Sequence, residues 1–130
     1  MSAKTDVKLG LYAEIRASRQ EVVDACLRAV AVMGKRAEAT AANAKVTVKI
    51  FPGVIRAISE VSPLVGINLK PGADGRVVVE VRIERYRTTS AIIGPKVLDG
   101  KSAYKNLLTS LEQELEAIGD GSGVIRRTGV

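Results

Sequence analysis

The sequence predicts an α+β fold, in which a mainly antiparallel sheet of about five strands is packed on one face by two long helices. The clearest observation is the stretch 76–87, RVVVEVRIERYR, where apolar and charged residues alternate with only Val78 out of step. Such alternation indicates a long strand with one dry face and one face open to water or a partner. Amphipathic helical patterns at 19–33 and 101–118 supply the surfaces that can cover the dry face.

A first strand is expected over 9–17, where apolar and polar residues alternate, and it leads directly into the first helix. Ser18 stands three residues before Glu21, which is the spacing of a capping box. The helix should therefore run from about Arg19 to Met33 and end at Gly34 in the left-handed conformation. Its buried stripe is predicted to consist of Val22, Val23, Cys26, Leu27, Val30 and Met33.

Four further strands are predicted at 36–42, 45–51, 64–70 and 76–87. Asn43 and Ala44 fit a turn between the first two of these, and PGADG at 71–75 is typical of a hairpin turn between the last two. The apolar residues 65, 67 and 69 should share the dry face with 77, 79 and 81. The segment 54–61 fits a short helical turn slightly better than a strand, and both interpretations stay open.

The chain should continue with a loop over 88–100 and a last helix from about Lys101 to Ile118. Apolar residues recur at helical spacing along this last helix. We expect residues 1–118 to form one α+β domain. Residues 119–130 are rich in glycine and polar residues and are predicted to be a flexible C-terminal tail.

The predicted order, β-α-β-β-β-β-α, resembles the helix-on-curved-sheet arrangement of TATA-binding-protein-like and helix-grip domains. The resemblance is one of topology, so it implies a sheet that curves around its helices. It transfers no activity and no site residue to this chain.

Composition narrows the chemistry of the chain. With no histidine and one cysteine, the usual zinc sites and histidine-assisted triads are excluded, and we expect no enzyme, no metal site and no cofactor. Burial within the first helix should make Cys26 an inert thiol. No apolar run approaches the roughly 20 residues of a membrane span, and the N-terminal stretch has no apolar signal region. The expected location is therefore the cytoplasm.

One candidate anion site lies before the last helix. The segment 94–102, GPKVLDGKS, has one residue too many for a nucleotide-binding P-loop, and no strand-helix-strand unit precedes it. Its cations and the backbone N–H groups at the helix start could still hold a ligand or an anion, at Lys96, Gly100, Lys101 and Ser102. The alternative is that Asp99 or Ser102 merely caps the helix.

A second candidate is a basic face of the sheet formed by Lys45, Lys49, Arg76 and Arg82. The net charge of +6 is concentrated in two segments: 35–56 has five basic residues against one acidic residue, and 76–87 has four arginines against two glutamates. Such a stripe, with Tyr12 and Tyr86 interleaved, would suit single-stranded nucleic acid. The glutamates on the same face equally suit cross-strand ion pairs within the protein.

The function that we expect from the sequence is a small, non-enzymatic binding or interaction module. One phenylalanine and three tyrosines leave few rings to fill the core, so an apolar or amphipathic small ligand could lie between sheet and helices. The alternative is a nucleic-acid-binding domain that uses the basic surface of 35–56 and 76–87. A homodimer through an exposed sheet face or edge strand is a further expectation, suggested by Val78.

Overall fold

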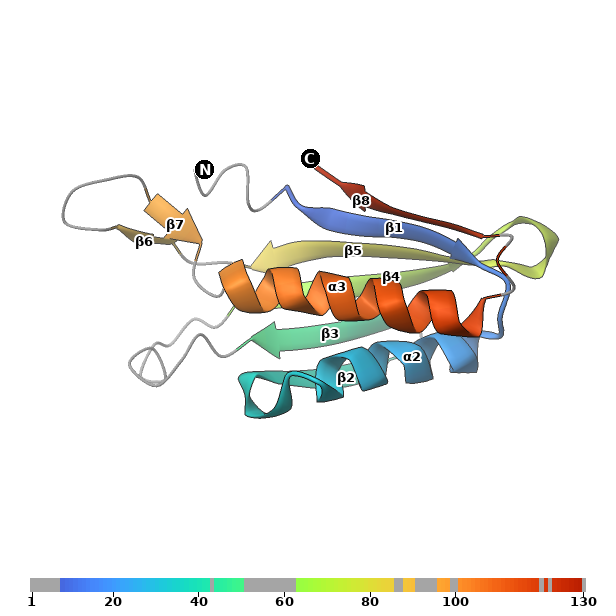
Figure 1. Cartoon of the computed structure of the whole chain (residues 1–130), viewed down its shortest axis with the longest axis horizontal. Coiled ribbons are helices and arrows are strands. Elements are labelled where there is room, and N and C mark those ends of the chain that lie inside the picture. Colours follow the sequence, from blue (N-terminus) through green and yellow to red (C-terminus); the bar gives the residue numbers. More distant parts are fainter. Residues whose placement is uncertain are drawn as a thin grey trace.

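The computed structural model describes residues 8–42, 44–50, 63–85, 88–90, 96–98, 101–119, 121 and 123–129. Figure 1 shows the elements, which in chain order are β1 (Gly10–Ile15), α2 (Arg19–Ala31), the 3₁₀ helix η1 (Gly34–Arg36), β2 (Ala37–Ala42), β3 (Lys45–Ile50), β4 (Leu64–Pro71), the 3₁₀ helix η3 (Ala73–Gly75), β5 (Val77–Arg85), β6 (Thr88–Ser90), β7 (Lys96–Leu98), α3 (Lys101–Ile118) and β8 (Val124–Thr128).

The predicted α+β fold is confirmed. A six-stranded sheet has the order β2-β3-β4-β5-β1-β8, and each neighbouring pair is antiparallel. The strand predicted at 76–87 is β5, and its register places Val79 opposite Leu69 and Val81 opposite Ile67. All four of these side chains are buried, so the predicted dry face is correct.

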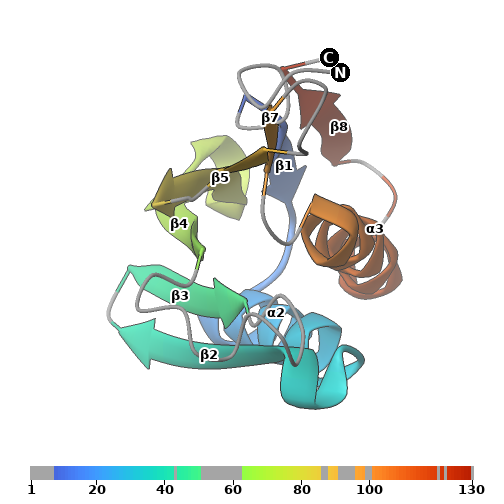
Figure 2. The same ribbon diagram turned by 90° about the vertical axis from the view of Figure 1, so that its left-hand side faces the viewer.

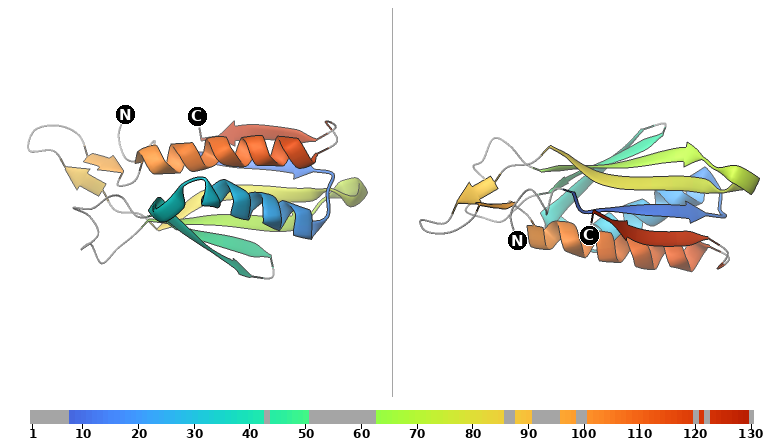
Figure 3. Two further views of the ribbon diagram at one scale, coloured as in Figure 1. Left: turned by 60° about the horizontal axis from the view of Figure 1, so that its bottom comes forward. Right: turned by 90° about the horizontal axis from the view of Figure 1, so that it is seen from above.

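The sheet bends around α2 and α3, which both lie on its inner side (Figure 2). The two helices run side by side in opposite directions, as Figure 3 shows from below. The helix α3 packs over β1 and contributes the largest share of the big buried side chains. These α3 residues are Tyr104, Leu107, Leu108, Leu111 and Leu115.

The predicted capping box begins α2. The Ser18 hydroxyl accepts a hydrogen bond from the Glu21 backbone N–H at 3.1 Å, and the Glu21 carboxylate accepts one from the Ser18 N–H at 3.1 Å. The helix ends at Ala31, two residues earlier than expected, and Gly34 has the predicted left-handed conformation, with φ of +61°. A glycine adopts this conformation without steric cost.

The predicted buried stripe of α2 extends too far toward one flank of the helix and omits two alanines. Leu27 is 36% exposed and Val23 is half-buried, whereas Ala25 and Ala29 are fully buried. The reason is that α3 packs against one flank of α2, where Arg28 reaches Glu114 at 3.2 Å. The buried face is therefore turned toward α3, and the opposite flank is left outside the core.

The predicted strands at 9–17, 36–42, 45–51 and 64–70 are present as β1, β2, β3 and β4. The predicted hairpin turn joins β4 to β5, where the Gly72 N–H donates to the Arg76 carbonyl at 2.8 Å. Asp74 and Gly75 have φ of +55° and +74° in this turn. The ambiguous segment 54–61 lies outside the described residues.

Two segments predicted to be irregular form strands. Within 88–100, β6 and β7 pair as a small antiparallel ribbon. Within 119–130, β8 pairs with β1, so the prediction of a flexible tail is wrong for Val124–Thr128. Without β8 the N–H and C=O groups on one side of β1 would have no strand partner. Pairing with β1 therefore orders Val124–Thr128, and the composition of this segment alone does not reveal such a partner.

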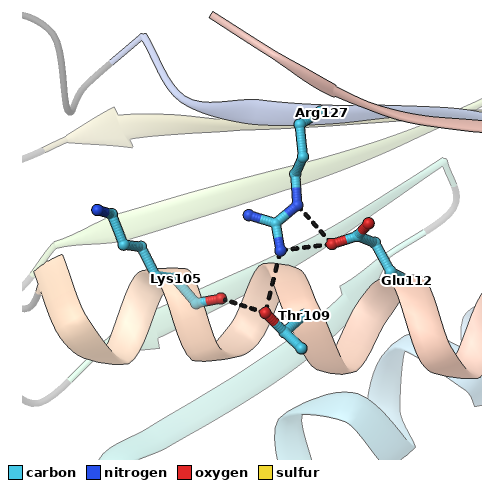
Figure 4. Close-up of polar contacts among 4 residues, drawn as sticks. All are labelled: Lys105, Thr109, Glu112 and Arg127. Carbon is cyan, nitrogen blue, oxygen red and sulfur yellow. Dashed lines mark hydrogen bonds and ion pairs between the residues drawn. The ribbon is translucent and has the colours of Figure 1, made fainter. Parts of the chain in front are cut away.

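Side chains and close backbone contacts fix β8 in place. The Arg127 guanidinium forms an ion pair with Glu112 on α3 and donates to the Thr109 hydroxyl at 3.0 Å (Figure 4). Gly123 and Gly129 lie so close to the backbone carbonyls of Glu14 and Lys8 that neither position has room for a Cβ atom. The glycines that suggested mobility therefore permit close approach to β1.

The start of α3 is tied to the start of β1 by Tyr104. Its buried hydroxyl donates a hydrogen bond to the Leu9 carbonyl, and burial raises the pKa of this hydroxyl above its usual value. This contact satisfies a backbone acceptor inside the core.

None of the helices in the described part of the chain is both long enough and apolar enough to cross a membrane.

We predict that Tyr104→Phe lowers the free energy of unfolding by about 1–2 kcal/mol, because it leaves the buried Leu9 carbonyl without its donor. Urea denaturation followed by far-UV circular dichroism measures the change. Tyr12→Phe is the matched control, since Tyr12 bonds a partly exposed carboxylate, that of Glu14, at 2.7 Å. Equal losses in the two variants would contradict this role of Tyr104.

Candidate functional site

The residues of the predicted anion site are only partly described by the structure. Lys96 is the first residue of β7, and Lys101 and Ser102 are the first two residues of α3. Ser102 is exposed, while Gly100 and the side chains of Lys96 and Lys101 lie outside what the structure describes. Since β7 is a short antiparallel strand, it differs from the buried parallel strand that precedes a P-loop.

One cation of the predicted basic face, Lys45, and its neighbour Lys70 are paired with glutamates. Lys45 binds the Glu84 carboxylate at 2.6 Å, and that carboxylate lies across Gly66, where a Cβ atom would come within 2.5 Å of it. Lys70 binds Glu80 at 3.2 Å on the same side of the sheet. The open face therefore carries the cross-strand ion pairs that the sequence left as the alternative.

Of the two tyrosines predicted to interleave with this face, Tyr86 lies outside the described residues. Tyr12 donates its hydroxyl to Glu14, which raises the pKa of the phenol, and the guanidinium of Arg126 lies 4.8 Å from the centre of its ring. The hydroxyl and the face of the Tyr12 ring are thus both in contact with other groups of the protein. The hydroxyl binds a carboxylate, and the ring face makes a cation–π contact.

The four cations of the predicted basic face do not form one patch. Arg76 lies at the hairpin end of β5, whereas Lys49 lies at the opposite end of the sheet. The cross-strand register places Lys49 opposite Leu64, and Leu64 opposite Arg85. Arg82 is exposed and makes no ion pair among the described residues.

Several cations from distant parts of the sequence gather at one end of the molecule. The ends of β3 and β5 and the starts of β1 and α3 meet there (Figure 1). Two described glutamates, Glu38 near the start of β2 and Glu84 near the end of β5, lie at the same end. We call this the cationic end, and its described cations are Lys8, Lys35, Arg36, Lys49, Arg85 and Lys105.

The interior between sheet and helices is densely occupied. Val46, Val48, Val65 and Ile67 of the sheet are completely buried, as are Leu107, Leu108 and Leu111 of the facing helix. Cys26 is buried among them, and burial raises the pKa of its thiol to about 12. The thiol is therefore protonated at neutral pH and is a poor nucleophile.

An open hollow of about 460 Å³ lies at the end of the sheet opposite the cationic end. It forms where the β1–α2 connection meets the β4–β5 hairpin, and we call it the hairpin groove. Two smaller hollows, of about 270 and 320 Å³, lie at the C-terminal ends of α3 and α2. The hairpin groove is lined by Ala17, Ser18, Arg19, Leu69, Lys70, Pro71, Gly72, Gly75, Arg76 and Val77.

The hairpin groove combines apolar walls with positive charge. None of the described residues that line it is acidic. The Lys70 ammonium is bound to Glu80, but Arg19 is exposed and makes no ion pair among the described residues. Such a site can accept a molecule with an apolar body and one anionic group.

Of the predicted site residues, Arg76 alone lines this groove, and no local pattern in the sequence connects it with Arg19. A signal was nevertheless present in the topology. Because β1 and β4 both pair antiparallel with β5, they run in the same direction, and their C-terminal ends lie at the same edge of the sheet. The capped helix start and the hairpin turn must therefore be neighbours.

Comparison with protein-family models, with curated proteins and with solved structures found no match. Within the described ranges there is also no group of three or more cysteine, aspartate or glutamate side chains placed to hold a metal ion. The hairpin groove and the cationic end are thus the two candidate sites, and their chemistry has to be argued from their own residues.

Proposed function

We propose that this protein is a non-enzymatic binding module that holds a small amphipathic anion in the hairpin groove. The apolar part of the ligand lies along Ala17, Leu69 and Val77, and its anionic group is bound by Arg19. The observation that carries the proposal is an apolar hollow whose described lining residues include Arg19 and no carboxylate.

The size and chemistry of the groove support this proposal. A volume of about 460 Å³ falls in the range of about 300–1,000 Å³ that is usual for small-molecule sites. Leu69 and Val77 reach the groove from the inner side of the sheet. The ligand would thus lie at the margin between sheet and helix, where the core leaves room.

Two further expectations belong to the same proposal. The module acts without catalysis, because its cysteine is a protonated buried thiol and it has no histidine to move a proton at neutral pH. We place it in the cytoplasm, where a single free thiol is ordinary.

A matched pair of fluorescent probes tests the groove. The anionic probe is 1-anilinonaphthalene-8-sulfonate, and the neutral probe is N-phenyl-1-naphthylamine, which lacks only the sulfonate. We predict that Arg19→Gln weakens binding of the sulfonate about fivefold, the effect of losing about 1 kcal/mol of charge pairing. Binding of the neutral probe should be unchanged, because the apolar walls remain.

Arg36→Gln is the control, since it removes an exposed arginine at the cationic end. It should leave the affinity for both probes unchanged. The proposal is wrong if neither probe binds the folded protein, or if Arg36→Gln weakens sulfonate binding as much as Arg19→Gln does.

A second function, binding of single-stranded nucleic acid, is favoured by the cationic end. Both basic segments identified in the sequence contribute to it, because Arg36 precedes β2, Lys49 is the last residue but one of β3, and Arg85 ends β5. Clustered cations with few acidic neighbours attract a phosphate backbone and release its counterions.

For this second function we predict that an oligonucleotide binds more weakly as salt increases. With about four phosphate contacts, the slope of log K against log salt should be about −3 for a single strand. Arg36→Gln should make the slope less steep by about 0.7, while Arg19→Gln should leave it unchanged. Fluorescence anisotropy of a labelled oligonucleotide measures both, and an affinity independent of salt would exclude this function.

A further inference from the structure

The two edges of the sheet are built differently. The edge strand β8 carries Arg126 and Arg127, and charged side chains are a common protection against pairing with another chain. The other edge strand, β2, has the sequence AEATAA with Glu38 as its one charge. It pairs with β3 in a regular register, with no bulge and no proline, and no described segment pairs with its outer side.

An apolar flank of α2 lies beside this unprotected edge. Figure 3 shows α2 between α3 on one side and the β2–β3 hairpin on the other. Arg28 marks the flank that faces α3. Val23 and Leu27 lie about 100° or more around the helix from Arg28, on the flank away from α3. Leu27 is 36% exposed there, beside a strand whose side chains are mostly exposed.

We propose that the β2 edge is a dimer interface, at which β2 pairs antiparallel with β2 of a second copy to form one continuous sheet. This goes beyond the proposed ligand binding and does not depend on it. A strand that pairs antiparallel with its own copy makes a self-complementary contact around a twofold axis. The same axis brings the two α2 flanks together, so Leu27 and Val23 of each copy are covered by their counterparts.

The faces of β2 restrict the register. Ala37, Ala39 and Ala41 face the helices, because they pair with the buried residues Ile50, Val48 and Val46 of β3. Pairs in an antiparallel ladder point to the same face, so a register centred on Thr40 keeps both α2 helices on one side. It places Ala39 opposite Ala41 of the second copy, and these small side chains leave room for the leucines above them.

Charge and area also fit a second copy. In this register Glu38 lies opposite Ala42 of the second copy, whose neighbour on β3 is a lysine, Lys45. The two Glu38 residues are about 14 Å apart, beyond the Debye length at physiological salt. A six-residue strand and a 13-residue helix are each about 20 Å long. Together they would bury about 1,000 Å² in total, near the lower limit for a specific interface.

A symmetric cross-link tests the register. Opposite residues in an antiparallel pair have Cβ atoms about 4.5–5.5 Å apart, so Thr40→Cys should form a covalent dimer on mild oxidation. The natural thiol is buried and will not compete. Val124→Cys is the control, because Val124 is an exposed residue, 44% accessible, on the opposite edge. It should form no covalent dimer under the same conditions, because β8 lies at the other edge of the sheet.

Sedimentation velocity over a range of concentrations measures the dimer without a cross-link. The wild-type protein should shift toward twice its 13.8 kDa mass. Thr40→Lys should raise the dissociation constant about tenfold or more, because it places like charges opposite each other. Leu27→Gln should weaken the dimer while leaving the monomer folded by circular dichroism.

Three results would overturn the proposal. The first is a wild-type protein that stays monomeric at every concentration. The second is a dimer that Thr40→Lys leaves intact, which would place the interface elsewhere. The third is equal cross-linking of Thr40→Cys and Val124→Cys, which would show random collision.

Discussion

The constraint on which the structure depends is the single apolar face of the sheet. The alternation along β5 puts Val79 and Val81 on that face, and the neighbouring strands repeat the pattern. Such a surface has to be covered, and the two helices cover it with a layer of leucines, valines and alanines. The bend of the sheet around them (Figure 2) follows the same requirement. Packed side chains thus fill the interior, and both candidate binding sites lie at the ends of the sheet.

The two ends of the sheet differ in charge and polarity. The hairpin groove joins apolar walls to Arg19, and the opposite end gathers cations from strands and helices that are distant in sequence. Between them, the open face of the sheet carries two ion pairs, Lys45 with Glu84 and Lys70 with Glu80. The net charge of +6 is therefore not matched by a continuous basic surface on the open face of the sheet.

Much of the fold could be predicted because its signals are local. The capping box of Ser18 and Glu21 and the alternation of β5 depend on neighbouring residues alone. The exposure of Leu27 could not be predicted, since it depends on α3, whose Glu114 contacts α2 from 86 residues away. The strand β8 is ordered by the open edge of β1, which no local composition reveals. Likewise, the groove combines Arg19 with Val77, residues that only the strand directions bring together.

The account depends most on the location of the ligand site. Amide chemical-shift mapping by NMR, with nitrogen-15-labelled protein titrated with 1-anilinonaphthalene-8-sulfonate, tests this location residue by residue, and a 13.8 kDa chain suits the method. The account predicts saturable shifts at Ser18, Arg19, Gly72 and Val77, with little change at Lys49 and Arg85. Shifts centred on the cationic end, or spread evenly over the sheet, would contradict it.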